Sequence, residues 1–556
     1  AALHVSGSSL SIGEPLTVSG TGISTTGAIR NLDATGTNDN TISGAITLGA
    51  SATIQSDADT LTLSNATAIT TASGKHLTIA GSGNTTVSGK VTGAGNVVKS
   101  GSGTLTLSST SNDYSGSTSI SAGTLTLGGV GVIPDSSAVS VSSGATLNMN
   151  SKAETIGSLA GAGAVTLTAI LTTGGDNTST TYSGATSSSS GSITKQGSGT
   201  MTLSGTNLHT GGVTVSAGVL EVSADTNLGA VPSPAAADKV VINGGTLSVT
   251  AGFTLSSTRG MSFGSSVGTI QVASGQTLTY GGVIANVSGQ AGALTKTGAG
   301  TLTLSGANTF TGKTIVSAGT LSIAADSNLG TAPGTAVTDQ LSINGGTLST
   351  TATLTLSTNR GVTIGDSDGT INVASGTTLT YGGVIAGASS SADFTKAGAG
   401  TLTLSGSSSY TGATTISAGT LQFSSSSAGE LSTSTAVTVS SGATFAVNGR
   451  TTSVGSIAGA GTITLGSGTL TAGGDNSSTV YTGAISGTGG LTKTGSGMLT
   501  LEQDLTFTGA LTISGGTVRL GTGGATGSVA STSIVNNGTL NINRSVLYSY
   551  SGVISG

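Results

Sequence analysis

The segment GANTFTGKT, residues 306–314, has the glycines, the lysine and the hydroxyl of a loop that holds a nucleotide phosphate. Such a loop reads G-x4-G-K-[ST] and lies between a strand and a helix, so that backbone amides surround the phosphate. Here the spacing between Gly306 and Gly312 is one residue too long, and no helical pattern follows. Related segments have other residues in place of Lys313: Gly212, Ala413 and Ala510. We therefore predict that Lys313 is a solvent-facing turn residue and that no nucleotide or other cofactor binds here.

The segment GDSDG, residues 365–369, resembles the turn that presents the nucleophile of a serine hydrolase. That serine needs a histidine base and an acid within hydrogen-bonding reach. The chain has three histidines, and the nearest to Ser367 is His209, which is remote in the sequence. The related segment GSSVG, residues 264–268, keeps the turn and loses both acids. We predict a turn there and no catalytic residue in the chain.

His209 belongs to the segment that begins at Lys195. In the other copies of this segment the same neighbourhood holds aromatic rings: Tyr114, Phe310, Tyr410 and Phe507. We interpret His209 as a ring that packs beside a Thr-Gly turn.

Short acidic turns could hold Ca²⁺ weakly through their oxygen atoms. They are Asp57 with Asp59, Asp366 with Asp368, and the run Asn38-Asp39-Asn40. The Gly-Gly-x-Gly-x-Asp array of calcium-binding β-rolls is missing, so we predict no metal site. Two GGDN turns, with Asp176-Asn177 and Asp475-Asn476, are interpreted as residues that hydrogen bond to their own backbone.

Five lysines recur in phase at a nearly constant spacing: Lys99, Lys195, Lys296, Lys396 and Lys493. One hypothesis makes them one binding point per period. The other, which we favour, makes each a charge at a turn that discourages edge-to-edge strand pairing.

Composition excludes several classes of protein. Only 7% of the 556 residues are charged and 94 are glycine, whereas ordinary globular domains carry about 25% charged residues. The net charge of −5 without a basic cluster argues against nucleic acid as a partner. No apolar run is long enough to cross a membrane as a helix. The absence of cysteine suits export of an unfolded chain.

Internal repetition is the strongest signal. The lysines begin copies of a pattern such as LTKTGAGTLTLSGANTFTGKTIVSAGTL, and the intervening residues repeat as well. We predict an N-terminal segment followed by five repeat modules, the last incomplete: 1–98, 99–194, 195–295, 296–395, 396–492 and 493–556.

A shorter period lies inside each copy, since Gly300-Thr-Leu-Thr-Leu returns as Gly319-Thr-Leu-Ser-Ile. In such a strand Leu302 and Leu304 face one side and Thr301 and Thr303 the other. A unit of about 20 residues cannot bury its apolar face alone, but stacked units can. The pattern predicts an all-β parallel β-helix of about 28 coils, one continuous rod about 130 Å long. A threonine ladder, Thr104 and Thr106 over Thr124 and Thr126, is predicted to span two coils.

The copies at Lys296 and Lys396 resemble the passenger-associated repeats of autotransporters, which are self-exporting surface proteins of Gram-negative bacteria. The resemblance implies a right-handed β-helix, export through a C-terminal β-barrel, folding outside the cell, and a chain that is a piece of a longer protein. The C-terminal coil would then expose a strand edge and self-associate, end to end or side by side.

We therefore expect a secreted or outer-membrane-associated, non-enzymatic stalk, adhesin or matrix protein. Its partner would be an extracellular surface or matrix ligand, such as carbohydrate or a second copy of the chain. Three alternatives remain open: a self-assembling fibre or surface-layer component, a polysaccharide-active β-helix enzyme, and an ice-binding protein.

Overall fold

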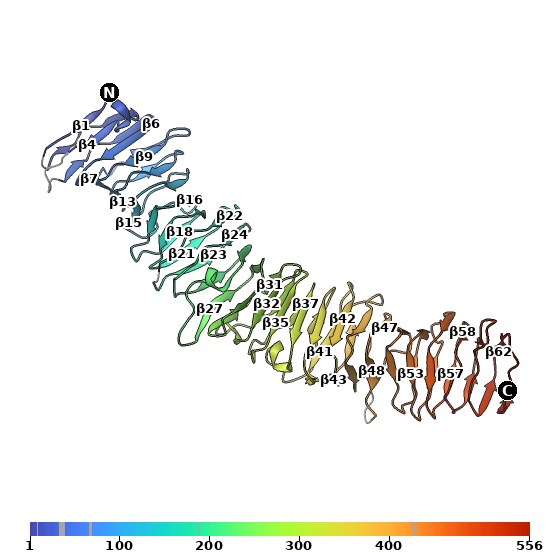
Figure 1. Ribbon diagram of the computed structural model, residues 1–556. Helices are drawn as coiled ribbons and strands as arrows, with labels where there is room; N and C mark the ends of the chain where they lie inside the picture. The colour runs from blue at the N-terminus through green and yellow to red at the C-terminus, as the bar shows by residue number, and fades with distance from the viewer. Residues whose placement is uncertain (8, 33–38, 66–68, 188, 426–429) are drawn as a thin grey trace. The chain divides into compact units, whose positions relative to one another are not determined.

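The computed structural model describes residues 1–7, 9–32, 39–65, 69–187, 189–425 and 430–556 (Figure 1). Parallel strands stack as a β-solenoid of about 24 turns, which confirms the predicted all-β class. The helical segments in these ranges are three short 3₁₀ turns: η1 (Ile23–Thr25), η2 (Asp225–Leu228) and η3 (Asp326–Leu329). None of them is long or apolar enough to cross a membrane.

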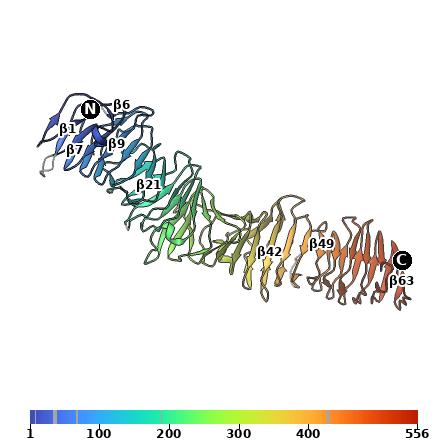
Figure 2. The same ribbon diagram turned by 45° about the horizontal axis from the view of Figure 1, so that its top comes forward.

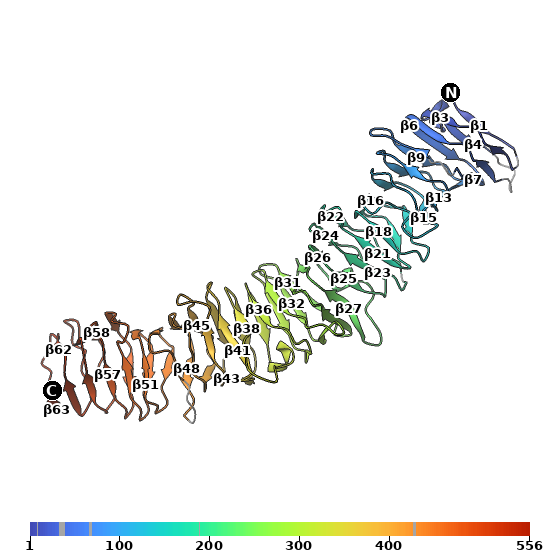
Figure 3. The same cartoon turned by 180° about the vertical axis from the view of Figure 1, so that it is seen from behind.

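The chain divides into two compact units, Ala1–Gln271 with Asn286–Gly292, and Val272–Ala285 with Ala293–Gly556. In the first unit one parallel sheet joins β2 (Ser11–Ile12), β5 (Asn40–Ile42), β7 (Thr60–Leu63), β10 (Asn84–Val87), β13 (Thr104–Leu107), β15 (Thr124–Leu127), β17 (Thr146–Asn148) and β20 (Ala164–Thr166). Figures 2 and 3 show this stacking of successive strands from two other directions.

A sheet of the second unit is built in the same way. It joins β40 (Leu354–Leu356), β43 (Thr378–Tyr381), β46 (Thr401–Leu404), β48 (Thr420–Phe423), β50 (Thr444–Ala446), β53 (Thr462–Thr464) and β56 (Ala484–Ser486). Each strand pairs with one from the next coil, because a coil can satisfy its backbone hydrogen bonds only with the coils above and below it.

The core consists of stacked apolar columns. In β35 (Thr301–Leu304), Leu302 and Leu304 are buried while the two threonines remain half-buried, as the two-residue period predicts. Leu302 stacks on Leu321 of β37 (Thr320–Ile323) in parallel register. Burying a leucine in this way contributes about 2 kcal/mol relative to leaving it in water.

The predicted number of coils is too high. Inside a repeat the coil is short and runs from Thr301 to its partner Thr320. The next coil, from Thr320 to its partner Thr347, is longer because η3 and a long loop are inserted there. Such longer coils outside the repeats reduce the stack from the predicted number to about 24 turns.

The predicted two-coil threonine ladder is too short. Register pairs place threonines over one another in five consecutive coils of the first unit: Thr41, Thr62, Thr86, Thr106 and Thr126. Coils of different length keep the outward threonine in phase, because the extra residues lie in the turns and not in the strands. Comparing segments at one fixed spacing could not reveal this.

Candidate functional site

Each of the five in-phase lysines is buried and binds backbone carbonyl groups, so the favoured prediction, a charge at a turn that discourages edge-to-edge strand pairing, is wrong. In β34 (Leu294–Thr297) the inward-facing residues are Leu294 and Lys296, and Lys296 is fully buried. Its Nζ donates hydrogen bonds to the carbonyl oxygens of Thr297 and Gly298, both at 2.7 Å, and of Ala318 in the next coil at 3.2 Å. The ammonium group thus ties two successive turns together.

Lys99, Lys195 and Lys396 lie in the same way, and Lys493 bonds two carbonyls of its own turn. Lys99 bonds the carbonyls of Ser100, Gly101 and Ala122; Lys195 those of Gln196, Gly197 and Ala217; Lys396 those of Ala397, Gly398 and Ala418; and Lys493 those of Thr494 and Gly495. We call each of these arrangements a lysine clamp.

A glycine of the next coil closes each lysine clamp. At Gly123 the backbone has φ near +66°, which side chains disfavour, and a Cβ there would lie 2.7 Å from the Lys99 Nζ. Gly319 has a similar φ of +62°, and a Cβ there would lie 2.4 Å from two carbonyl oxygens of the preceding turn. The lysine, its G-x-G turn and the Ala-Gly turn of the following coil therefore form one structural unit.

Burial controls the electrostatics of the lysine clamps. It lowers the pKa of Lys99, Lys296 and Lys396 to about 8, because a charged amine loses its water there. Burial also lowers the pKa of Lys195 and Lys493, but the carboxylates of Asp176 and Asp475 act in the opposite direction. All five side chains are at most 2% exposed, so the amines are structural groups and no substrate reaches them.

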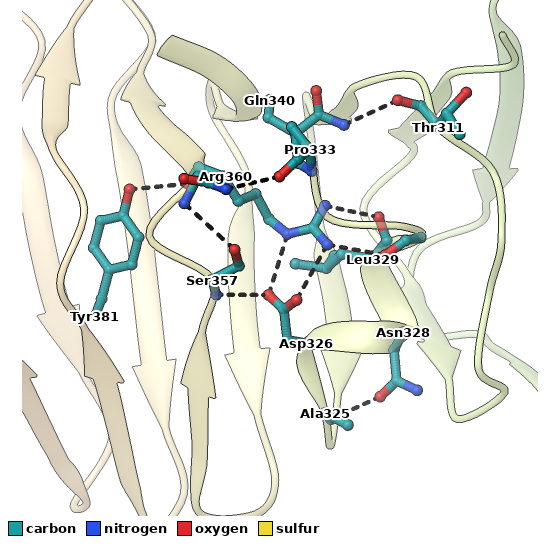
Figure 4. A network of polar contacts seen from close by, with 12 residues as sticks. Thr311, Ala325, Asp326, Asn328, Leu329, Pro333, Gln340, Ser357, Arg360 and Tyr381 are labelled. Atoms are coloured by element: carbon teal, nitrogen blue, oxygen red, sulfur yellow. Dashed lines mark hydrogen bonds and ion pairs between the residues drawn. The ribbon is translucent and has the colours of Figure 1, made fainter. Parts of the chain in front are cut away.

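Two arginines clamp longer turns. Arg360, which begins β41 (Arg360–Ile364), is 1% exposed and pairs with Asp326 of η3, Nε to Oδ1 at 3.1 Å. Its guanidinium also donates to the carbonyls of Leu329 and Gly330, at 3.1 and 2.9 Å (Figure 4). Arg259, at the start of β30 (Arg259–Phe263), binds Asp225, Leu228 and Gly229 in the same way. A planar guanidinium suits this combined recognition of a carboxylate and carbonyls.

These arginines fix two segments, residues 224–239 and 325–340, which we call the clamped loops. Each segment ends in the first residues of a strand, β27 (Ala236–Ile242) or β38 (Val337–Ile343). In the second loop, Gln340 donates to the carbonyls of Thr311 and Gly312, and Asn359 donates to that of Pro333 at 2.9 Å. The clamped loops expose apolar side chains: Val231 is 49% and Val337 37% exposed. Beside the first loop lies a surface hollow of about 390 Å³, lined by Thr210, Val231, Pro232, Pro234 and Lys239 among others.

A glutamate holds a different turn in the first unit. Glu154 is 3% exposed and accepts hydrogen bonds from the backbone amides of Gly131, Val132 and Ile133 at 2.7–3.2 Å. Burial raises the pKa of Glu154 to about 7, while the three amides act in the opposite direction. A hollow of about 300 Å³ beside it is lined by Asp135 and the exposed Val130.

The residues of the two chemistry-like motifs are surface turn residues. Lys313 faces solvent as predicted, 43% exposed and 3.5 Å from Asp339, and the strand β36 (Thr314–Val316) follows it where a phosphate loop needs a helix. Ser367 lies in the exposed turn between β41 and β42 (Gly369–Val373), where its backbone amide donates to Asn344.

The structure confirms the packing role of His209. His209 is 1% exposed, and the equivalent residues Phe310 and Tyr410 are buried to the same degree. The Nδ1 atom of His209 lies 2.8 Å from the Thr186 hydroxyl. Burial, and secondarily the charge of Arg259, lower the pKa of His209 to about 4, so the imidazole is neutral.

Several acidic residues of these turns bond other groups of the chain, while the buried Oδ2 of Asp59 has no hydrogen-bond partner among the described residues. Asp57 pairs with Arg30, and the Asp39 carboxylate accepts from the amide of Thr60 at 3.1 Å, while Asn38 lies outside the described residues. Within those residues, no three His, Asp or Glu side chains gather as a metal site requires.

In the two GGDN turns the predicted hydrogen bonds to the turn's own backbone are made by the aspartate and not by the asparagine. Asp176 bonds the amide of Thr178 two residues on, as predicted. Asn177 instead accepts from Ser198 of the next coil, and Asn476 accepts likewise from Ser496, so these asparagines link coils.

The arginine and glutamate clamps do not follow from the sequence reasoning. The repeated ADTNLG and ADSNLG, together with the later TRG and NRG, contain the acid and the arginine of the two clamped loops. The signal is present as similarity between two modules, but nothing in the sequence shows that the two halves meet.

The lysine clamps lie in the segments that known proteins share. The family described as Passenger-associated-transport-repeat matches residues 97–127, 193–222, 294–323, 394–423 and 491–520, and each match contains one clamp lysine and the glycine that closes it. The chain thus contains five passenger-associated-transport repeats and resembles the passenger of an autotransporter.

The chain is also similar to a named relative. It is 36% identical over 176 residues to "Adhesin BmaC autotransporter" of Brucella suis biovar 1 (strain 1330). The match covers 29% of this chain and 5% of the relative's length. No solved structure matches the chain.

Proposed function

We propose that this passenger is a non-enzymatic adhesin stalk on or near the surface of a Gram-negative bacterium, and that its clamped loops make the adhesive contacts. The repeats of the family and the relative's name as an adhesin support the surface role. A solenoid carries such contacts well, because neighbouring coils satisfy one another's backbone groups and leave the turns free to vary.

The observation that carries the proposal is the pair of clamped loops. A loop that only connects strands needs no buried ion pair, yet Arg259 and Arg360 are each 1% exposed and fix a loop at several points. Holding a loop in one conformation before a partner arrives lowers the entropic cost of binding. The exposed valines of the clamped loops are the side chains that such a partner would bury.

The proposal is tested on wells coated with collagen or fibronectin, with fluorescent beads that carry the chain. Replacing Val231 and Val337 by serine should reduce bead retention at least fivefold. Val283 and Val384, which are 46% and 50% exposed outside the clamped loops, provide the matched control pair of substitutions to serine. Retention that neither pair changes, or that both pairs reduce alike, would show that the clamped loops are not the adhesive surface.

A further inference from the structure

A column of threonines runs across eight consecutive coils of the second unit. Strand pairing places each threonine directly over the next: Thr277, Thr301, Thr320, Thr347, Thr370, Thr395, Thr415 and Thr438. The first and last side chains are exposed and the six between them are half-buried, so all eight reach the surface. With coils about 4.8 Å apart, the column is about 34 Å long. We call it the threonine column.

The hydroxyl groups of the threonine column are free. Among the described residues, none of the eight side chains hydrogen bonds to another protein group, although outward hydroxyls elsewhere do, as Thr403 does with Gln422. A second row, Thr279, Thr303, Ser322 and Ser349, lies two positions further along four of the same strands, about 6.7 Å away. In this row Thr279 and Thr303 are half-buried, whereas Ser322 is buried and the Ser349 hydroxyl accepts a hydrogen bond from Asn372. The column contains no charged and no aromatic side chain.

These properties restrict the occupant. A single threonine hydroxyl gains little by exchanging water for another partner, so a useful affinity needs many contacts made at once. A flexible soluble polymer would lose conformational entropy at every contact, whereas a rigid periodic solid would not. The neutral column complements a neutral solid. Methyl and hydroxyl groups at a constant spacing also restrict the water beside them.

We propose that the threonine column binds the ordered water of an ice face, so that the chain attaches to ice. This activity goes beyond the adhesion proposed above and does not depend on it, because the column lies outside the clamped loops. Each coil adds one hydroxyl and one methyl group to the same row, so the binding strength grows with the number of coils in register.

The test measures partitioning of the chain into a slowly growing ice hemisphere. The expected result is at least fivefold enrichment in the ice relative to serum albumin. Substitution of Thr347 and Thr370 by lysine interrupts the centre of the column and should return the chain to the albumin value. The control substitutes Ser342 and Thr363, which pair with each other on another face of the same two coils, by lysine. This control should keep the enrichment, and circular dichroism should show that both variants remain folded.

Three outcomes would overturn the proposal. The parent chain could partition like albumin, or both double variants could lose enrichment equally. Alternatively, the Thr347 and Thr370 variant could lose binding to microcrystalline cellulose while its partitioning into ice stays unchanged. That last result would assign the threonine column to a crystalline polysaccharide. Because the bead assay uses other residues, failure here leaves the adhesion result interpretable, and the reverse also holds.

Discussion

At the scale of single residues, a lysine clamp replaces water by carbonyl oxygens, three of them at Lys99, Lys195, Lys296 and Lys396 and two at Lys493. An ammonium group loses much of its hydration when it is buried, and hydrogen bonds to backbone carbonyls return part of that energy. The carbonyls gain as well, because tight turns of this kind leave their oxygen atoms without a strand partner. The clamp therefore links the stability of one coil to the presence of the next.

Substituting Lys296 by methionine should lower the free energy of unfolding by about 1–3 kcal/mol, because three turn carbonyls lose their donor inside the protein. The matched control is Lys313, which is 43% exposed and whose substitution by methionine should change stability by no more than about 0.5 kcal/mol. Denaturation in guanidinium measures both. Equal effects at the two positions would show that the buried ammonium is not a clamp.

The lowered pKa values predict how stability depends on pH. The pKa of Lys99, Lys296 and Lys396 is about 8 in the folded chain and 10.5 for an exposed lysine. Above pH 8 the unfolded chain therefore binds more protons than the folded chain, and the free energy of unfolding should rise with pH. Below pH 8 these lysines are charged in both states, so their contribution is constant.

The measurement compares unfolding at pH 8 and at about 9, one unit below the ordinary tyrosine pKa of about 10, where few tyrosines of the unfolded chain have ionised. A triple variant with methionine at Lys99, Lys296 and Lys396 should show a smaller rise than the parent. A decrease in the parent that the variant lacks would mean that the folded chain holds the ammonium ions more strongly than water does.

The alternation of inward and outward residues along a strand predicts which leucines are buried. The same rule predicts that the lysines are buried too. It places Leu302 and Leu304 inward, and both are buried. Leu294 and Lys296 stand in the same alternation, so the lysine also faces inward. The opposite prediction for the lysine rests on the rule that a charged side chain is rarely buried. The carbonyl group of Ala318, which helps to make its burial possible, belongs to the next coil, and alternation alone does not reveal that contact.

At the scale of elements, the arginine clamps give the inserted loops a fixed conformation. Substituting Arg360 by methionine should destabilise the clamped loop 325–340 by about 2–4 kcal/mol, since Asp326 and two carbonyls lose their partner. Hydrogen exchange should then become faster in η3 and in the loop. The control is substitution of Arg519 by methionine, at an outward position of β60 (Thr517–Leu520). This control should leave hydrogen exchange in the loop unchanged. Unchanged exchange in the Arg360 variant would remove the arginine from this role.

Loop lengths are the part of the elements that the sequence does not predict. The strands follow from Thr-Leu alternation, but alternation does not fix how many residues separate one strand from its partner in the next coil. Asp225 and Arg259 are 34 residues apart in the sequence, more than one coil. Their contact depends on the length of that coil, which only the stacked structure provides.

At the scale of the molecule, stability comes from contacts between neighbouring coils. A solenoid behaves as a row of units in which each interface contributes separately, so a defect in one coil weakens that coil and its two neighbours first. One lysine clamp lies in each family repeat, and in four of the five repeats, at Lys99, Lys195, Lys296 and Lys396, its ammonium group bonds the next coil and reinforces that interface. Between these interfaces the coils differ in length and carry the loops that distinguish one module from another.

Successive coils stack with equivalent strand residues paired, and the cysteine-free chain allows a direct test of this stacking. Thr320 and Thr347 are separated by a whole coil in sequence and paired in space, so their Cα atoms lie about 4.8 Å apart, within the range of a disulfide. With cysteine at both positions, mild oxidation should cross-link the chain within itself, and mass spectrometry after alkylation should count no free thiol. Cysteine at Thr320 and Ser349, two positions out of register and about 8 Å apart, should leave two free thiols. Two free thiols in the first pair, or equal cross-linking in both pairs, would contradict the stacking on which every other conclusion depends.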